Sequence, residues 1–213
     1  MKKIIMTGVA ICALSTSAIA ADGIYHTDGD SMYNQPFTGP YVGVYGGYGW
    51  NNVDSSIGDT NVDGADYGVY AGFKADTLLN NTVNRLGLGL TGAIEVYYGQ
   101  SSADQDVGGV DIEKDYEYGI SFRPGLSIVD DLSPVGVNSY GILGYKRANF
   151  EVDGLGDETF DGFELGLGTE LVAYDNVGVR LEYAHTWYGD EDIGGVNVDN
   201  EEDTVRLGVG YNF

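Results

Sequence analysis

This 213-residue sequence has little cysteine, histidine, proline or positive charge. Its one cysteine, Cys12, lies in a segment that we expect to be removed, so no disulfide framework can stabilise the mature chain. Stability must therefore come from hydrogen-bonded structure and burial. Lys and Arg number 10 against 33 Asp and Glu, which gives a net charge of −23. A chain this acidic repels nucleic acid and anionic surfaces unless divalent cations intervene, so we expect no nucleic-acid partner.

The first part of the chain, residues 1–20, has the pattern of a cleaved signal peptide. A pair of lysines precedes a short apolar stretch, and the Ala-Ile-Ala pattern at 18–20 marks the cleavage site. The apolar stretch is too short for a transmembrane anchor, and no stop-transfer pattern follows it. We then expect an irregular N-terminal leader at 21–39 and one folded domain at 40–213. Loss of the two lysines leaves 8 basic against 33 acidic residues, a net charge of −25.

Glycine and tyrosine, by contrast, are abundant. The 34 glycines and 17 tyrosines are unlike a helical protein and typical of a curved β-structure with aromatic girdles. In the last ten residues, apolar side chains occupy every second position, which predicts a β-strand with one apolar face. These positions are Val205, Leu207, Val209, Tyr211 and Phe213.

Seven further stretches show the same alternation, which predicts eight strands in all. The seven are residues 41–50, 67–75, 86–98, 116–128, 137–150, 162–171 and 177–187. Four of the connections are long and acidic, and the others are shorter, as expected of an outer-membrane barrel. We interpret the long ones as loops at residues 51–66, 100–115, 153–161 and 189–203.

The stretch 137–150 is the ambiguous strand. Tyr140, Ile142 and Ala148 suggest one register, whereas Leu143 and Tyr145 suggest the opposite one. A bulge near the glycine at position 144 would reconcile the two sets.

The two faces of the strands indicate which one meets lipid. The non-apolar face is mostly glycine, alanine, serine and threonine, which suits the narrow interior of an eight-stranded barrel. The other face, rich in Leu, Val, Ile, Phe and Tyr, suits lipid. We therefore predict an all-β fold, an eight-stranded antiparallel up-and-down transmembrane β-barrel, in preference to a soluble barrel or sandwich.

This orientation places single charges of both signs in the lumen. They would have to pair there, because an unpaired buried charge costs several kcal/mol. The network would either fill the barrel and fix its register or line a narrow path for water or small ions. Its predicted members are Lys74, Glu95, Glu117, Arg123, Glu164, Glu170, Arg180, Glu182 and Arg206.

The sequence resembles a known family over residues 39–213. The signal peptide, the opening PYVGVYGGYGW, the acidic or glycine-rich loops and the terminal VRLGVGYNF are similar to the OmpA-like outer-membrane barrels, including the opacity and porin-like surface antigens. The resemblance implies location in the outer membrane of a Gram-negative envelope. It also implies that the five alternating apolar residues of the last strand form the signal read by the outer-membrane assembly machinery.

Few motifs could carry chemistry. Gly87-x-Gly89-x-x-Gly92 matches a dinucleotide fingerprint but lies inside a predicted strand instead of opening a helix. Of the two histidines, His26 is in the leader. His185 shares the lipid-facing parity, where it fits an aromatic girdle, and no serine or cysteine nucleophile has a visible base. We predict no enzymatic activity, no catalytic residue, no cofactor and no metal site.

We therefore expect a non-enzymatic, monomeric outer-membrane protein that contributes to envelope integrity and surface interaction through its loops. Its expected partners are outer-membrane lipid and lipopolysaccharide, with divalent cations as one possible bridge to the acidic loops. The leading alternative is a narrow pore for small solutes or ions. An enzyme that modifies lipid A and an adhesin are further alternatives.

Overall fold

A computed structural model of the protein describes most of the chain beyond residue 36. The described stretches are 37–55, 58–80, 86–102, 104–107, 110–130, 135–152, 156–173, 176–189, 191–193 and 196–213. The predicted signal peptide and nearly all of the leader lie outside them. Within the described stretches, no helix has the length and apolar character needed to cross a membrane.

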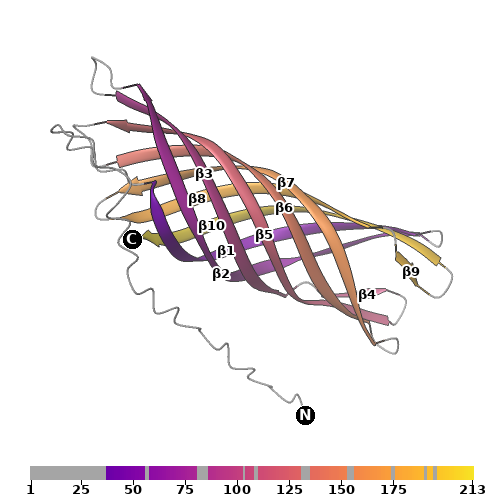
Figure 1. The fold of residues 1–213 in the computed structure, drawn as a ribbon. Helices are drawn as coiled ribbons and strands as arrows, with labels where there is room; N and C mark the ends of the chain where they lie inside the picture. Colours follow the sequence, from indigo (N-terminus) through magenta and orange to yellow (C-terminus); the bar gives the residue numbers. More distant parts are fainter. Residues whose placement is uncertain are drawn as a thin grey trace, which may run out of the picture. The chain divides into compact units, whose positions relative to one another are not determined.

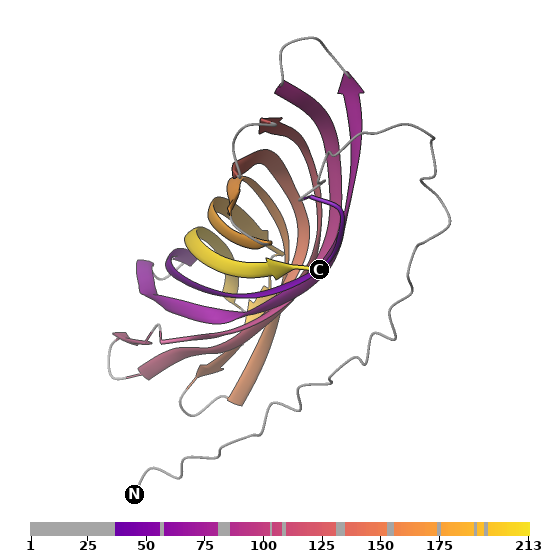
Figure 2. The ribbon, with the colours of Figure 1, turned by 90° about the vertical axis from the view of Figure 1, so that its left-hand side faces the viewer.

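Eight long antiparallel strands close into a barrel (Figure 1). They are β1 (Gly39–Ser55), β2 (Gly58–Asn80), β3 (Leu86–Ser101), β5 (Val110–Asp130), β6 (Val135–Val152), β7 (Gly156–Ala173), β8 (Val177–Tyr188) and β10 (Val196–Asn212). Each long strand pairs with the next, and β10 also pairs with β1 from Tyr41↔Asn212 to Ser55↔Val198. Figure 2 shows the yellow β10 beside the indigo β1 at this closure. The predicted eight-stranded barrel is confirmed.

The chain reverses through four long hairpins at one end of the barrel, which we call the hairpin end. Two short strands lie there, β4 (Asp104–Val107) against β5 and β9 (Glu191–Ile193) against β10, away from the C-terminus (Figure 1). The prediction of loops at 51–66, 100–115, 153–161 and 189–203 was wrong in extent, because strand pairing continues through most of these residues. A strand that projects beyond lipid needs no apolar face, so its ladder persists where the apolar alternation ends.

Strand β6 is regular, so the predicted bulge near Gly144 was wrong. Its pairing with β7 runs without a shift from Val135↔Ala173 to Val152↔Gly156. The register shift in this region lies instead in β5, between Lys114 and Tyr116.

The ambiguity in β6 arose because both of its faces carry large side chains. Leu143 and Tyr145 point outward and are 41% and 48% exposed, whereas Tyr140 and Ile142 are buried inside the barrel. A strand whose lumen face includes aromatic and aliphatic residues loses the polar–apolar contrast that reveals register.

The abundant glycines and tyrosines pack against each other in the lumen. A Cβ atom added at Gly72 would lie 2.5 Å from the Tyr41 hydroxyl, and one at Gly119 would lie 2.7 Å from the Tyr97 ring. Real Cβ contacts are not this short, so each glycine makes room for an aromatic ring from a nearby strand. Five or more such rings fill a lumen that would otherwise be lined by small residues. The inward tyrosines are Tyr41, Tyr45, Tyr70, Tyr97, Tyr140 and Tyr188.

The outside of the barrel is an apolar belt. Every long strand exposes large apolar side chains, for example Leu167 at 71% and Ile94 at 59%. Aromatic residues gather on the part of the belt nearer the hairpin end, at Trp50, Tyr67, Tyr98, Tyr118, Tyr145, Phe163 and Trp187. An apolar band bordered by aromatic rings is typical of a barrel that crosses an outer membrane.

Candidate functional site in the barrel lumen

The structure places all nine predicted lumen charges inside the barrel, each with at most 6% of its surface exposed. Period-2 alternation alone puts them there, since each lies on the strand face opposite the apolar belt. They come from β2, β3, β5, β7, β8 and β10, so the barrel wall brings together residues far apart in sequence. Their ion pairs form layers along the lumen.

Two arginines and two glutamates form the layer that we call the central cluster: Glu95, Arg123, Arg180 and Glu182. The Glu95 carboxylate lies 2.7 Å from an Arg123 nitrogen and 2.5 Å from an Arg180 nitrogen. Glu182 contacts the same two guanidinium groups. Each acid therefore shares both cations, and the cluster is neutral.

Tyrosine hydroxyls complete the hydrogen bonding of this layer. Tyr41 donates to Glu95 at 2.9 Å, and Tyr140 donates to Glu182 at 2.6 Å. The Arg180 guanidinium also stacks 3.4 Å from the centre of the Tyr70 ring. Because the buried charges have both ion-pair and hydrogen-bond partners, the desolvation cost of the layer is offset.

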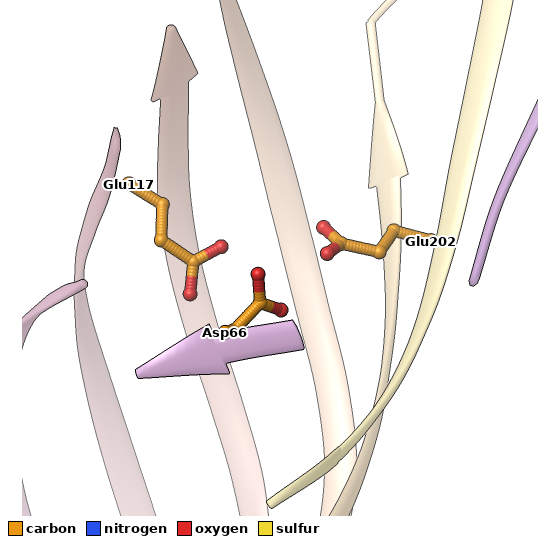
Figure 3. Close-up of side chains that lie close together, drawn as sticks. All are labelled: Asp66, Glu117 and Glu202. Atoms are coloured by element: carbon orange, nitrogen blue, oxygen red, sulfur yellow. The ribbon is translucent and has the colours of Figure 1, made fainter. Parts of the chain in front are cut away.

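A second layer, the outer cluster, lies toward the hairpin end: Asp66, Lys114, Glu117, Lys146 and Glu202. The Lys114 ammonium is 2.6 Å from Glu202 and 2.8 Å from Glu117, and the Lys146 ammonium is 2.5 Å and 2.7 Å from the same two carboxylates. Asp66 is 4.0 Å from Lys114. Figure 3 shows the three carboxylates of this cluster pointing toward one another.

Three clustered carboxylates raise the question of a metal ion. Oxygen atoms of Asp66, Glu117 and Glu202 lie within 4.8 Å of one another. However, Lys114 and Lys146 each contact both glutamates, so ammonium groups already occupy the positions that a cation would take. This donor set does not fit a metal site.

Arg206 joins the outer cluster to the rest of the network. Its guanidinium lies 3.1 Å from Glu117 and 3.4 Å from Glu164, with the centres of the Tyr45 and Tyr97 rings at 5.4 Å and 5.0 Å. Cation, acids and aromatic rings together fill the barrel at this level.

The opposite end of the lumen holds the remaining predicted pair. The Lys74 ammonium lies 2.5 Å from Glu170 and also donates a hydrogen bond to the Asn212 side-chain oxygen at 3.0 Å. Phe37, which immediately precedes the barrel, is fully buried, with its ring centre 5.9 Å from the same ammonium. A cavity between this pair and the central cluster, lined in part by Tyr41 and Thr91, has a volume of about 10 Å³. That is about the space of one water molecule.

Sequence reasoning missed four members of the outer cluster: Asp66, Lys114, Lys146 and Glu202. For Asp66 and Glu202 the signal was present, because counting back in steps of two from the lumen residues Lys74 and Arg206 reaches them. They were assigned to loops because the apolar alternation stops there.

The two lysines were hidden by register. Lys146 follows the outward Tyr145, so it would have been found once the register of β6 was known. Lys114 breaks the parity of Glu117 because the β5 register shifts between residues 114 and 116. No period-2 count through that irregularity could have placed it inside.

His185 lies on the outer wall, as its parity predicts. Its ring packs edge-on against Trp187, with centres 4.3 Å apart, and its Nδ1 is 2.9 Å from Asp203. Tyr183 donates to the same carboxylate at 2.6 Å. The contacts of His185 are thus with acidic or aromatic side chains, and the neighbouring Thr186 is fully buried in the lumen.

The comparison with known proteins agrees with this architecture. The family model described as "Outer membrane protein beta-barrel domain" matches residues 8–213. This chain belongs to that family. The predicted location in the outer membrane and the predicted resemblance to outer-membrane barrels are thereby confirmed.

Two relatives and one solved structure illustrate the similarity and differ in how much of this chain they cover. The chain is 29% identical over 228 residues to the 25 kDa outer-membrane immunogenic protein of Brucella abortus, covering 100% of this chain and 99% of the relative. It is 31% identical over 127 residues to the 22 kDa outer membrane protein of Rhizobium leguminosarum, with 56% and 57% coverage. Among solved structures, Neisserial surface protein A matches with 19% identity, a TM-score of 0.46, and coverage of 82% of this chain and 99% of that one.

Within an outer-membrane barrel, the last strand presents the predicted assembly signal to lipid. All five of its residues point outward, from 37% exposed at Val205 to 64% at Phe213. Reading of this pattern by the assembly machinery stays a prediction.

Proposed function

We propose that the protein is a non-enzymatic outer-membrane barrel that is closed to solutes. In this proposal it contributes to envelope integrity and presents its four hairpins at the cell surface. The observation that carries the proposal is the filled lumen: ion-pair layers at the central and outer clusters, joined by Arg206, which packs near the Tyr45 and Tyr97 rings. An eight-stranded barrel has an interior just wide enough for side chains.

The alternative of a narrow pore is less well supported by the same residues. A conducting path would have to pass the central cluster, where both glutamates contact both arginines. Breaking one such buried pair leaves an uncompensated charge, at a cost of about 3–5 kcal/mol. Transient opening by this route would be rare.

The other class of function to be distinguished from a closed barrel is a lipid-modifying enzyme. The outward His185–Asp203 pair supplies an acid and a base, but the hydroxyl bonded to it is the phenol of Tyr183, which donates to Asp203 and not to the imidazole. We therefore propose a role for His185 in the aromatic girdle. Contact with lipopolysaccharide through divalent cations at the acidic hairpins, and a monomeric state, are also parts of the proposal.

Deletion and complementation in the producing bacterium test this function. Cells without the protein should become more sensitive to detergent, while their uptake of small hydrophilic solutes stays unchanged, because a closed barrel supports the envelope without passing solutes. The wild-type chain and the His185→Ala variant should both restore resistance and leave the lipid A acyl pattern unaltered. A fall in solute uptake on deletion would favour the pore, and an altered acyl pattern would favour the enzyme.

A further inference from the structure

One region of the outer wall carries a positive charge. Six of the described basic side chains, those of Lys74, Lys114, Arg123, Lys146, Arg180 and Arg206, are buried in the lumen. Among the described side chains, Arg147 on β6 is the basic one on the outer face, with 41% of its side chain exposed. In a chain of net charge −23, an outward cation is a distinctive feature.

The same region has an apolar groove of about 490 Å³. Its floor is the backbone at the Ser121↔Gly144 pair, where the Ser121 side chain is buried in the lumen and Gly144 carries none. Its volume lies within the range of about 300–1,000 Å³ that is usual for small-molecule sites. The groove walls are formed by Ile94, Ile120, Phe122, Leu143, Tyr145 and Phe163.

Groove and cation adjoin each other on neighbouring rungs of the sheet. Tyr145 pairs with Phe163, and two residues nearer the hairpin end Arg147 pairs with Asp161. A two-residue step along a strand is roughly 6.6 Å. Arg147 therefore stands directly above the groove, at the level where Tyr118 on β5 also pairs with it. This is the border of the apolar belt nearer the hairpins, where lipid headgroups meet acyl chains.

Arg147 retains hydrogen-bonding capacity for a ligand. Its Nε contacts one Asp161 oxygen, and its NH2 group donates to the other at 2.8 Å. The Tyr118 side chain is a further hydrogen-bond partner. A guanidinium has five N–H donors, so two of them remain for a further anion. The pair with Asp161 is solvent-exposed, and such pairs hold their partners weakly.

We propose that this region binds a phosphorylated glycolipid of the lipid A type, with its phosphate at Arg147 and an acyl chain in the groove. Charge complementarity selects an anionic headgroup, because Arg147 is the outward cation among the described side chains. Position selects a lipid, because the groove opens within the apolar belt directly below that cation. Arginine suits phosphate through paired, charge-assisted hydrogen bonds.

A lipid titration followed by native mass spectrometry tests the site. The full mature chain, folded in detergent, would be titrated with bis-phosphorylated lipid A, with dephosphorylated lipid A of the same acyl chains, and with phosphatidylglycerol. We expect the phosphorylated lipid A to bind tightest, and Arg147→Ala to weaken it roughly tenfold, as expected for a charge-assisted contact. Leu143→Trp, which fills the groove, should weaken all three lipids.

Two further variants make the test specific. Asp161→Asn should bind lipid A as well as or better than wild type, since it releases the guanidinium. Val44→Trp, an equally exposed site on β1 at the opposite side of the barrel, should change nothing. Equal binding of the dephosphorylated lipid or of phosphatidylglycerol would overturn the proposal, as would unchanged binding by Arg147→Ala. A loss in Asp161→Asn as large as in Arg147→Ala would show that the pair is merely structural. None of these outcomes depends on whether the lumen conducts.

Discussion

Glu95 shows how one carboxylate can link three parts of the barrel wall. Its oxygens contact Arg123 on β5 and Arg180 on β8, and it accepts a hydrogen bond from Tyr41 on β1. It is 1% exposed, so water cannot replace any of these partners. Removing its charge would leave two buried guanidinium groups to share Glu182.

We therefore expect Glu95→Gln to lower the free energy of unfolding by about 3 kcal/mol, the usual cost of breaking a buried ion pair from one side. Urea unfolding in phosphatidylcholine vesicles measures this change.

Tyr67→Phe is the matched control, because the Tyr67 hydroxyl donates to Gln100 at an exposed position. Its effect should stay within about 0.5 kcal/mol. Equal stability of Glu95→Gln and wild type would mean that the central cluster does not hold the barrel together.

At the residue scale, the sequence predicts whether a charged side chain points to the lumen or to the outside wherever the apolar–polar alternation is intact. All nine predicted charges lie in the lumen. Which of them form ion pairs could not be predicted, because partners such as Glu95 and Arg180 are 85 residues apart in the sequence. The lumen position of Lys114 could not be predicted for another reason. One register shift in β5 reverses, at that point, which alternate residues face the lumen. The Arg147 groove also depends on the packing of four neighbouring strands, which no single segment encodes.

Strand β10 closes the barrel and ends the chain. Its Tyr211 and Phe213 rings pack edge-on at 5.1 Å on the lipid face, and the Phe213 amide donates to the Pro40 carbonyl at 2.9 Å. The ring of Phe213 is 64% exposed, so little of its surface is buried against the rest of the barrel. Its side chain therefore matters more to whatever reads the strand during assembly than to the finished fold.

We predict that Phe213→Ala lowers the amount of protein assembled in the outer membrane while leaving the stability of the purified barrel nearly unchanged. Heat-modifiable gel migration of membrane fractions measures assembly, and urea unfolding of refolded protein measures stability. Val177→Ala, another exposed apolar residue (43%) on β8, is the control and should assemble normally. Normal assembly of Phe213→Ala would contradict the assembly-signal prediction.

At the element scale, strands were predictable inside the membrane and poorly predictable beyond it. Lipid requires an apolar face, so the belt shows strict alternation. The hairpin extensions, such as Asn51 to Ser55 in β1, are paired through backbone ladders on both sides and are rich in polar residues. Composition therefore suggested loops where the chain continues as strand. In β6 the strand was predicted but its register was ambiguous, because aromatic residues occupy both faces.

The architecture of the whole molecule follows from closure of the barrel and from the filling of its lumen by side chains. Strand number, antiparallel order and the outward apolar face were all predictable, because eight alternating segments leave few other arrangements. Closure follows because β10 finds its second partner in β1. The packing of tyrosines over glycines then explains how a lumen lined by small residues becomes solid. Function is less determined than fold, since the same architecture can be open or closed depending on those side chains.

Single-channel recording in planar bilayers tests the closed lumen most directly. The mature full-length chain would be refolded, shown to be folded by its heat-modifiable migration, and inserted beside an open porin that verifies the recording. The ion-pair layers and aromatic rings predict a steady baseline without conductance steps at moderate voltage. Reproducible conductance steps from the folded wild-type protein would contradict a closed barrel and establish the pore.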